Sequence, residues 1–309
     1  MTAAQTMSPL ATSRDIEQLK SSIDEVGYCI INDALAPDVL SQVQTRLRNQ
    51  ARAERDAGVE FSNPGHLDNQ WVNMLINKGE VFAGLVTHEL ASQVVSHALG
   101  PEFLLSCCDA QIKHAGSGFM PLHTDQWWMP QPSSPDAKPV RPAGMIRGDG
   151  DALEPSPVER SIGGIAVVNI MWMVTDFTDD NGATLIVPSS HRSGLQPDSS
   201  VPHKIKTLRA TGKAGTALIF DGRLWHAAGA NETDRTRYAI TCTFCGPQFR
   251  QLENYTRGLR PEVMERASPE FLRLLGFKAW STYGHTGDPS LDCSVSGTQA
   301  LGELGGDAT

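Results

Sequence analysis

The sequence predicts an α+β fold with a mainly β core, arranged as an antiparallel sheet or barrel. Helix-like periodicity is confined to roughly the first hundred residues, and β-rich apolar runs separated by Gly, Asp and Asn turns follow it. No strand–GxGxxG–helix unit occurs, which argues against a dinucleotide-binding fold. With 309 residues, of which 40% are hydrophobic, the chain can bury a substantial core and is neither fibrous nor wholly disordered.

The helices are predicted from apolar residues that recur every three or four positions. This spacing predicts one helix from Ser13 to about Ser22 and a second from Pro37 to Ala57. Between them, GYCIIND predicts a short strand that ends in a turn. Residues 81–99 predict one or two further helices, which end at Gly100-Pro101.

Five later runs are rich in β-branched and apolar residues, and each is bounded by turn-forming residues. We expect strands at FLLSCCDAQIKH (103–114), GIAVVNIMWMV (164–174), ATLIVP (183–188), GTALIFD (215–221) and YAITCTF (238–244).

Composition divides the chain into one predicted domain and three less regular segments. Residues 1–14 are small and polar and predict a flexible N-terminus, and residues 287–309 predict a polar tail. We expect a single domain over 15–286. Within it, 131–162 is rich in Pro, Gly, Ser and charge, and a loop of this length is a candidate lid or a disordered insertion.

The charge balance limits the kinds of partner. Lys and Arg number 26 and Asp and Glu number 35, giving a net charge of −9, which disfavours nucleic acids and anionic membranes and favours a small-molecule substrate. No signal peptide or membrane-spanning run is visible, so we expect a cytoplasmic protein with its six cysteines reduced and mostly buried. No pattern sets the number of subunits.

The segment His123-Thr124-Asp125 is the first candidate for chemistry. Residues two apart on an extended segment point to the same side, so this imidazole and this carboxylate can face one metal ion. The motif alone is weak, because His66-Leu67-Asp68 repeats it. The second copy precedes all the later strands and is predicted to be a loop or surface group.

A metal site of two histidines and one carboxylate needs a second histidine from elsewhere in the chain. His226 follows an apolar strand and its turn in IFDGRLWHAAGAN. Arg235 and Arg237 lie nine and eleven residues beyond it, at the start of the next strand. An arginine there can hold a dicarboxylate that also chelates the metal, because its planar guanidinium pairs with a carboxylate at two points.

Four motifs in order resemble the phytanoyl-CoA dioxygenase-like iron(II)/2-oxoglutarate oxygenases over roughly residues 15–285. They are EVGYCIINDALAPDVL, LHTD, TDFTDDNGATLIVPSSHR and DGRLWHAAGANETDRTRYAI. The resemblance implies a double-stranded β-helix, a jelly-roll or cupin-like barrel with N-terminal and flanking helices.

The resemblance also implies roles for individual residues. His123, Asp125 and His226 become the iron ligands, and Arg237 becomes the anchor of 2-oxoglutarate, with Arg235 as the alternative. Because Asp125 completes the ligand set, halogenation is not expected. Two positions depart from the family pattern: Ser189 replaces a glycine, and Ala228 replaces a hydroxyl residue that contacts the cosubstrate.

Further residues are candidates for the pocket. Gln111 and Asn169 are expected to contact the cosubstrate, or else to line the barrel as ordinary polar residues. Trp127, Trp128 and Met171 are candidates for the substrate pocket, with plain core filling as the alternative.

The implied activity is a dioxygenase reaction that uses Fe(II), 2-oxoglutarate and O2, with ascorbate as a candidate reductant. We expect hydroxylation of an unactivated C–H bond, with release of succinate and CO2. Desaturation, epoxidation, epimerisation or rearrangement at the same site are the alternatives, and a non-catalytic β-barrel binding protein is the rival class.

Overall fold

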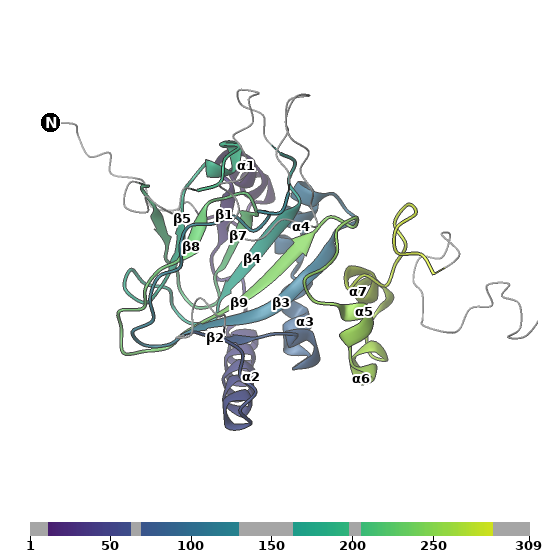
Figure 1. Cartoon of the computed structure of the whole chain (residues 1–309), viewed down its shortest axis with the longest axis horizontal. Coiled ribbons are helices and arrows are strands. Elements are labelled where there is room, and N and C mark those ends of the chain that lie inside the picture. The colour runs from purple at the N-terminus through teal and green to yellow at the C-terminus, as the bar shows by residue number, and fades with distance from the viewer. Residues whose placement is uncertain (1–11, 63–68, 130–162, 198–204, 287–309) are drawn as a thin grey trace, which may run out of the picture.

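The computed structural model describes residues 12–62, 69–129, 163–197 and 205–286 (Figure 1). The candidate lid at 131–162, the tail at 287–309, His66-Leu67-Asp68 and most of the predicted flexible N-terminus lie outside the described residues.

Two antiparallel sheets form the centre of the molecule. The larger sheet has six strands in the order β1-β7-β4-β9-β3-β2, and the smaller has three in the order β6-β5-β8. The strands are β1 (Tyr28–Ile31), β2 (Asn69–Val72), β3 (Leu104–Lys113), β4 (Val167–Met173), β5 (Thr184–Ile186), β6 (Leu208–Ala210), β7 (Ala217–Asp221), β8 (His226–Ala228) and β9 (Arg237–Cys245). Each predicted run therefore contains a strand.

Alternation along the strands divides the apolar residues between two cores. On β4, Ile170 and Trp172 belong to the cluster that includes the helices, whereas Met171 and Met173 belong to a second cluster with residues of β1, β5 and β7. Successive side chains of a strand point to opposite faces of the sheet. One face of the large sheet is therefore covered by helices, and the other faces the small sheet and forms the barrel interior.

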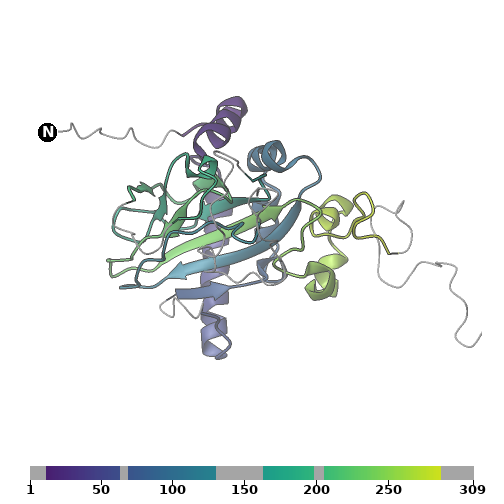
Figure 2. The ribbon, with the colours of Figure 1, turned by 45° about the horizontal axis from the view of Figure 1, so that its top comes forward.

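The N-terminal helices cover the outer face of the large sheet. They are α1 (Ile16–Val26), α2 (Pro37–Asp56), α3 (Val81–Val86) and α4 (Glu89–Leu99), joined by a 3-10 turn, η1 (Leu75–Asn77). The Asp15 side chain caps α1 by accepting from two amides of its first turn, and Gly27 ends it with a positive φ of 86°. The long helix α2 passes behind the sheet in the tilted view (Figure 2).

Residues 81–99 form two helices because His88 interrupts the run. Its backbone is non-helical, and its Nδ1 accepts from the amide of Ala91, which caps α4. Its Nε2 lies 3.1 Å from the Ala34 carbonyl. The sequence predicted either one or two helices over residues 81–99, and the cap at His88 explains why there are two.

Three short helices follow the last strand, α5 (Tyr255–Gly258), α6 (Pro261–Met264) and α7 (Pro269–Leu274), and they group at one end of the sheet (Figure 1). Glu253 connects these helices to β3 and to the segment before η1 through three hydrogen bonds. Its Oε1 accepts from the amide of Met74 at 2.5 Å, and its Oε2 accepts from the amide of Cys108 at 3.0 Å and the Tyr255 hydroxyl at 2.5 Å.

Glu253→Ala is therefore expected to lower the free energy of unfolding by about 2–4 kcal/mol, because it leaves two buried amides and a buried hydroxyl without their acceptor. Urea unfolding followed by circular dichroism measures this loss. Glu265→Ala is the matched control, since Glu265 is exposed on the same part of the chain. Equal stability of both variants would contradict a structural role for Glu253.

Two further predictions bear on the chain as a whole. The described cysteines (Cys29, Cys107, Cys108, Cys242 and Cys245) are all buried free thiols, as expected. In the described ranges, no helix has the length and apolar character needed to cross a membrane. The cytoplasmic location stays a prediction.

Candidate metal centre

Three predicted metal ligands come together from two neighbouring extended segments. The chain before Asp125 runs antiparallel to β8, and the amides of His123 and His226 each donate to the other residue's carbonyl at 3.0 Å. The same pairing continues at Met120, whose amide donates to the Ala228 carbonyl. The two histidines are therefore cross-strand partners, and Asp125 lies two residues further along the first segment.

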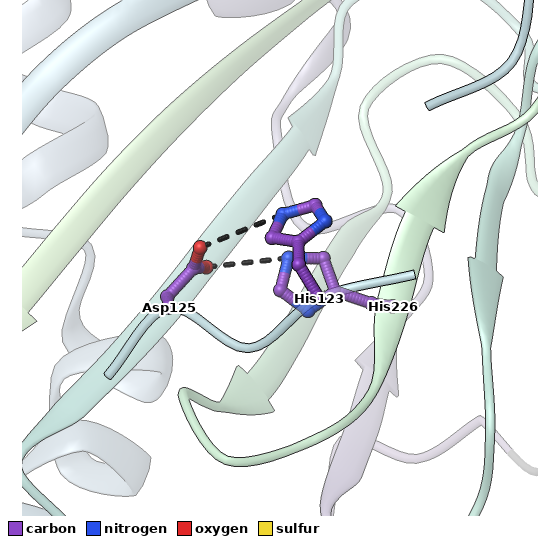
Figure 3. Close-up of side chains that lie close together, drawn as sticks. All are labelled: His123, Asp125 and His226. Carbon is purple, nitrogen blue, oxygen red and sulfur yellow. Dashed lines mark ion pairs between the residues drawn. The ribbon is translucent and has the colours of Figure 1, made fainter. Parts of the chain in front are cut away.

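The side chains form a compact group with the composition of a two-histidine, one-carboxylate metal site (Figure 3). One ligand atom of each residue lies within 4.8 Å of the others. The two carboxylate oxygens of Asp125 face different histidines, at 3.3 Å from His226 Nε2 and 3.7 Å from His123 Nε2. The side chains of His123 and Asp125 are 21% and 25% exposed and that of His226 is 8% exposed, so His226 is the most buried of the three.

Hydrogen bonds to the backbone set the state of both imidazoles. His123 Nδ1 lies 2.9 Å from the Pro121 carbonyl, and His226 Nδ1 lies 2.9 Å from the Leu224 carbonyl. A carbonyl oxygen only accepts, so each Nδ1 carries the proton. In the neutral rings each Nε2 then presents its lone pair toward Asp125, which is the arrangement that a metal ion requires.

The turn before His226 fixes this geometry. Asp221 accepts from the backbone amide of Arg223 at 2.8 Å and also pairs with its guanidinium. Between them, the Gly222 carbonyl accepts from the amide of Asp125 at 2.8 Å, and a Cβ at Gly222 would lie 2.6 Å from Cβ of Val167. Only glycine therefore fits where the turn, β4 and the Asp125 segment meet.

A short relay of side chains orients the carboxylate. The Asn169 amide donates to Asp125 Oδ2 at 2.7 Å, and the Thr243 hydroxyl donates to Asn169 Oδ1 at 2.7 Å. Asn169 is fully buried on β4, and Thr243 is its cross-strand partner on β9. Strands β4 and β9 of the large sheet therefore fix the orientation of the Asp125 carboxylate. A contact between Asn169 and the cosubstrate stays a prediction.

Asn169→Ala is expected to weaken Fe(II) binding by roughly 10–100-fold, because outer hydrogen-bond partners of metal ligands typically contribute that much. Thr243→Val keeps the amide but removes the group that orients it, so a smaller loss is expected. Anaerobic Fe(II) titration measures both, with circular dichroism to check the fold. An unchanged dissociation constant in Asn169→Ala would contradict the relay.

Arg237 is the most unusual charge in the described residues. It begins β9, is 2% exposed, and its Nε and Nη1 have no hydrogen-bond partner in the part of the chain that the structure describes. Its Cζ lies 4.6 Å from the centre of the Phe177 ring, and burial lowers the pKa of Arg237 to about 9. A buried guanidinium without a counter-ion is costly, and a carboxylate ligand would remove that cost.

The alternative anchor, Arg235, lies at the surface with a side chain that is 91% exposed. Of the other predicted residues, Gln111 lies on β3, on which the odd-numbered residues after the bulge at Leu105/Cys107 face the barrel interior. Met171 accepts from the Thr184 hydroxyl at 3.1 Å. Trp128 packs edge-on against Phe249 with ring centres 5.0 Å apart.

Trp127 is half-buried directly after the metal group. A substrate role for Trp127, Trp128 and Met171 stays a prediction.

Sequence reasoning missed two residues of the interior, Asp109 and Thr243. Both lie in runs that were interpreted only as strands. The signal for Asp109 was present, because a carboxylate in the middle of the apolar run LLSCCDAQI must be buried if the run is a central strand. Thr243 gave no such signal, since threonine is common in strands.

Comparison with known proteins identifies the family. The profile of the phytanoyl-CoA dioxygenase (PhyH) family matches residues 23–239, more than half of the chain. The chain belongs to the phytanoyl-CoA dioxygenase family. As a PhyH protein it is an Fe(II)/2-oxoglutarate-dependent dioxygenase, which confirms the predicted enzyme class and cofactors.

Relatives in sequence come from fungi and bacteria. The dioxygenase af480 of Aspergillus fumigatus is 27% identical over 290 residues, which cover 86% of this chain and 81% of af480. The uncharacterized protein Rv1501 of Mycobacterium tuberculosis is 28% identical over 264 residues, which cover 85% of this chain and 87% of Rv1501.

Two of the solved structures that share this fold are the proteins EctD and SnoN. EctD from S. alaskensis aligns with a TM-score of 0.57 at 19% identity, over 81% of this chain and 83% of EctD. The α-ketoglutarate-dependent epimerase SnoN from nogalamycin biosynthesis aligns with a TM-score of 0.55 at 16% identity, over 79% of this chain and 88% of SnoN. The likeness confirms the predicted double-stranded β-helix with flanking helices.

Proposed function

We propose that this PhyH protein hydroxylates an unactivated C–H bond of a small or medium organic substrate, using Fe(II) held by His123, Asp125 and His226. The observation that carries the proposal is the combination of this ligand group with the buried guanidinium of Arg237, whose Nε and Nη1 have no partner among the described residues. The first fits a metal ion and the second fits a carboxylate, which are the two groups that 2-oxoglutarate must contact.

Both ends of the cosubstrate have a chemical match among the described residues. The donor set of two imidazoles and one carboxylate suits Fe(II) and leaves coordination positions for other ligands. Lys113, the cross-strand partner of Arg237, is also buried, so two cations lie at the same level of the sheet. The distal carboxylate of 2-oxoglutarate would offset the charge of Arg237.

When bound by these residues, Fe(II) and 2-oxoglutarate would supply the oxidising chemistry, in which one atom of O2 would enter succinate and the other the product, with release of CO2. The chain's own residues position and shield these groups. Asn169 and Thr243 orient Asp125, the backbone carbonyls hold the two imidazoles in one tautomer, and Arg237 pairs with the distal carboxylate.

A second candidate outcome at the same site is epimerisation or another hydrogen-abstraction reaction. The likeness to the epimerase SnoN supports this second candidate, because SnoN is an epimerase with the same fold. The product separates the outcomes by mass spectrometry. A hydroxylated product gains one oxygen atom, a desaturated product loses two hydrogen atoms, and an epimer keeps the mass of the substrate.

The test of the proposed function is anaerobic titration with Fe(II) and 2-oxoglutarate, followed by the visible charge-transfer band of the chelate. We expect the band in the wild-type protein and 2-oxoglutarate-dependent release of succinate once O2 is admitted. Folded, iron-loaded protein that forms no band would reject the proposal and favour a binding protein without this activity.

A further inference from the structure

The inner face of the large sheet carries a row of polar residues beside the metal group. On β3, Asp109 lies opposite Thr241 of β9, which in turn lies opposite Met171 of β4. All three side chains alternate with residues of the helix-covered core, so they point into the barrel. The row runs parallel to the Thr243–Asn169 row that holds Asp125 and is about 7 Å from it along the strands.

Two polar atoms in this row are buried without a partner. Asp109 is 6% exposed and Thr241 is 5% exposed, and in the ranges that the structure describes neither Asp109 Oδ1 nor Thr241 Oγ1 has a hydrogen-bond partner. The other carboxylate oxygen of Asp109 accepts from the Cys107 thiol at 3.2 Å. Buried polar atoms are usually satisfied, so an adjacent unsatisfied pair inside a barrel indicates a ligand contact.

Asp109 shares the barrel interior with the metal group. Burial, and to a smaller degree the negative charges of Glu253 and Asp125, raise the pKa of Asp109 to about 7, while the Cys107 thiol and the Gln111 amide oppose that rise. The Asp109–Thr241 row is the next inward-facing row after the Thr243–Asn169 row, which holds Asp125. A group held at Asp109 would therefore lie close to the reacting centre.

The chemistry of the pair selects its ligand. A carboxylate oxygen accepts hydrogen bonds, and a threonine hydroxyl can both donate and accept. The cosubstrate 2-oxoglutarate has only acceptors and two negative charges, so it does not complement the ionised form of Asp109. A hydroxyl or amino group complements both residues, whereas a carboxylate on the substrate would be repelled by Asp109.

We propose that Asp109 and Thr241 form the polar end of the substrate pocket and bind a hydroxyl or amino group of the substrate. The inference rests on the proposed function, since it places that group relative to the iron site. By fixing one donor group of the substrate, the pair would determine which carbon faces the metal centre. Asp109 is thus a specificity-determining residue, and the substrate class is an alcohol or amine.

The test uses four compounds with one decalin skeleton that bears a hydroxyl, a primary amine, a methyl or a carboxylate. Binding is read from the change that each compound causes in the anaerobic Fe(II)–2-oxoglutarate charge-transfer band, and turnover is read from succinate release. Wild type is expected to bind the hydroxyl or amine compound roughly tenfold or more tightly than the methyl compound, and the carboxylate compound weakest.

The variants separate Asp109 from the cosubstrate site. Asp109→Ala is expected to abolish the preference for the polar compounds, and Asp109→Asn to lose the amine preference while retaining part of the hydroxyl preference. Thr241→Val is expected to weaken both by a few-fold. The charge-transfer band without added compound should be unchanged in each variant. Asp179→Ala, at an exposed position, is the matched control.

Three outcomes would overturn the inference. In the first, wild type binds no polar compound more tightly than the methyl compound. In the second, Asp109→Ala and Asp109→Asn retain the wild-type preference. In the third, these variants weaken 2-oxoglutarate binding instead, which would assign Asp109 to the cosubstrate. Absence of the band in wild type is a different result, since it rejects the proposed function itself.

Discussion

Arg237→Met is expected to make the ligand-free protein more stable while it removes most of the affinity for 2-oxoglutarate. The variant replaces a buried guanidinium, two of whose nitrogens lack a partner in the described ranges, by an apolar side chain of similar length beside Phe177. Removing an uncompensated buried charge should raise the free energy of unfolding by about 1–3 kcal/mol. Loss of the charge pair should cost about 2–5 kcal/mol of binding, roughly a 30-fold to several thousand-fold rise in Kd.

Thermal unfolding with and without 2-oxoglutarate, under anaerobic conditions with Fe(II), measures both effects. The wild-type Tm should rise on addition of 2-oxoglutarate, whereas the variant should start higher and respond little. Arg235→Met is the matched control, because Arg235 is two residues away and exposed. A variant that is less stable than wild type, or that binds 2-oxoglutarate normally, would contradict the role assigned to Arg237.

His226→Ala has the second large expected effect, the loss of iron binding and of activity. Removing a ligand should weaken Fe(II) binding by more than about a hundredfold, since loss of an outer partner alone costs roughly 10–100-fold. His123→Ala should behave alike, because the two imidazoles are equivalent in their backbone bonds and both face Asp125. Metal content after dialysis, the charge-transfer band and succinate release are the three measurements.

His97→Ala provides the control for these variants. His97 is a partly exposed helical histidine whose Nε2 lies 2.8 Å from Asp24. It should keep the metal, the band and the activity of wild type. Retention of iron by folded His226→Ala protein would reject the ligand assignment, whatever the activity of that protein.

The sequence predicted the parts of the site that depend on order along the chain. His123 and Asp125 could be paired because their spacing matches an extended segment, and His226 and Arg237 followed in the right order at the expected separation. Arg237 is buried and Arg235 is exposed, and this difference supports the proposal that Arg237 is the anchor. Burial distinguishes them, and burial depends on the pairing of β9 with β3.

Other features needed the three-dimensional structure because their sequences carry no periodic signal. The strands β2, β6 and β8 are short and contain polar residues, so they form no apolar run, whereas the equally short β1 and β5 lie within apolar runs. Asp109 and Thr241 are 132 residues apart, and only the register of β3 against β9 makes them neighbours. Glu253 likewise joins segments distant in the chain, so its role could not be predicted from its neighbours in sequence.

The backbone carbonyls that hold His123 and His226 also bear on how the enzyme acquires its metal. Each imidazole is oriented by a carbonyl only two residues earlier in its own chain, so the local backbone sets the direction of both proposed ligands. Such a nitrogen-rich chelator binds divalent transition metals in the Irving–Williams order, in which nickel, copper and zinc exceed iron. Binding of the correct metal in the cell therefore depends on which ions are available when the protein folds. Such a site can also bind zinc or copper in place of iron.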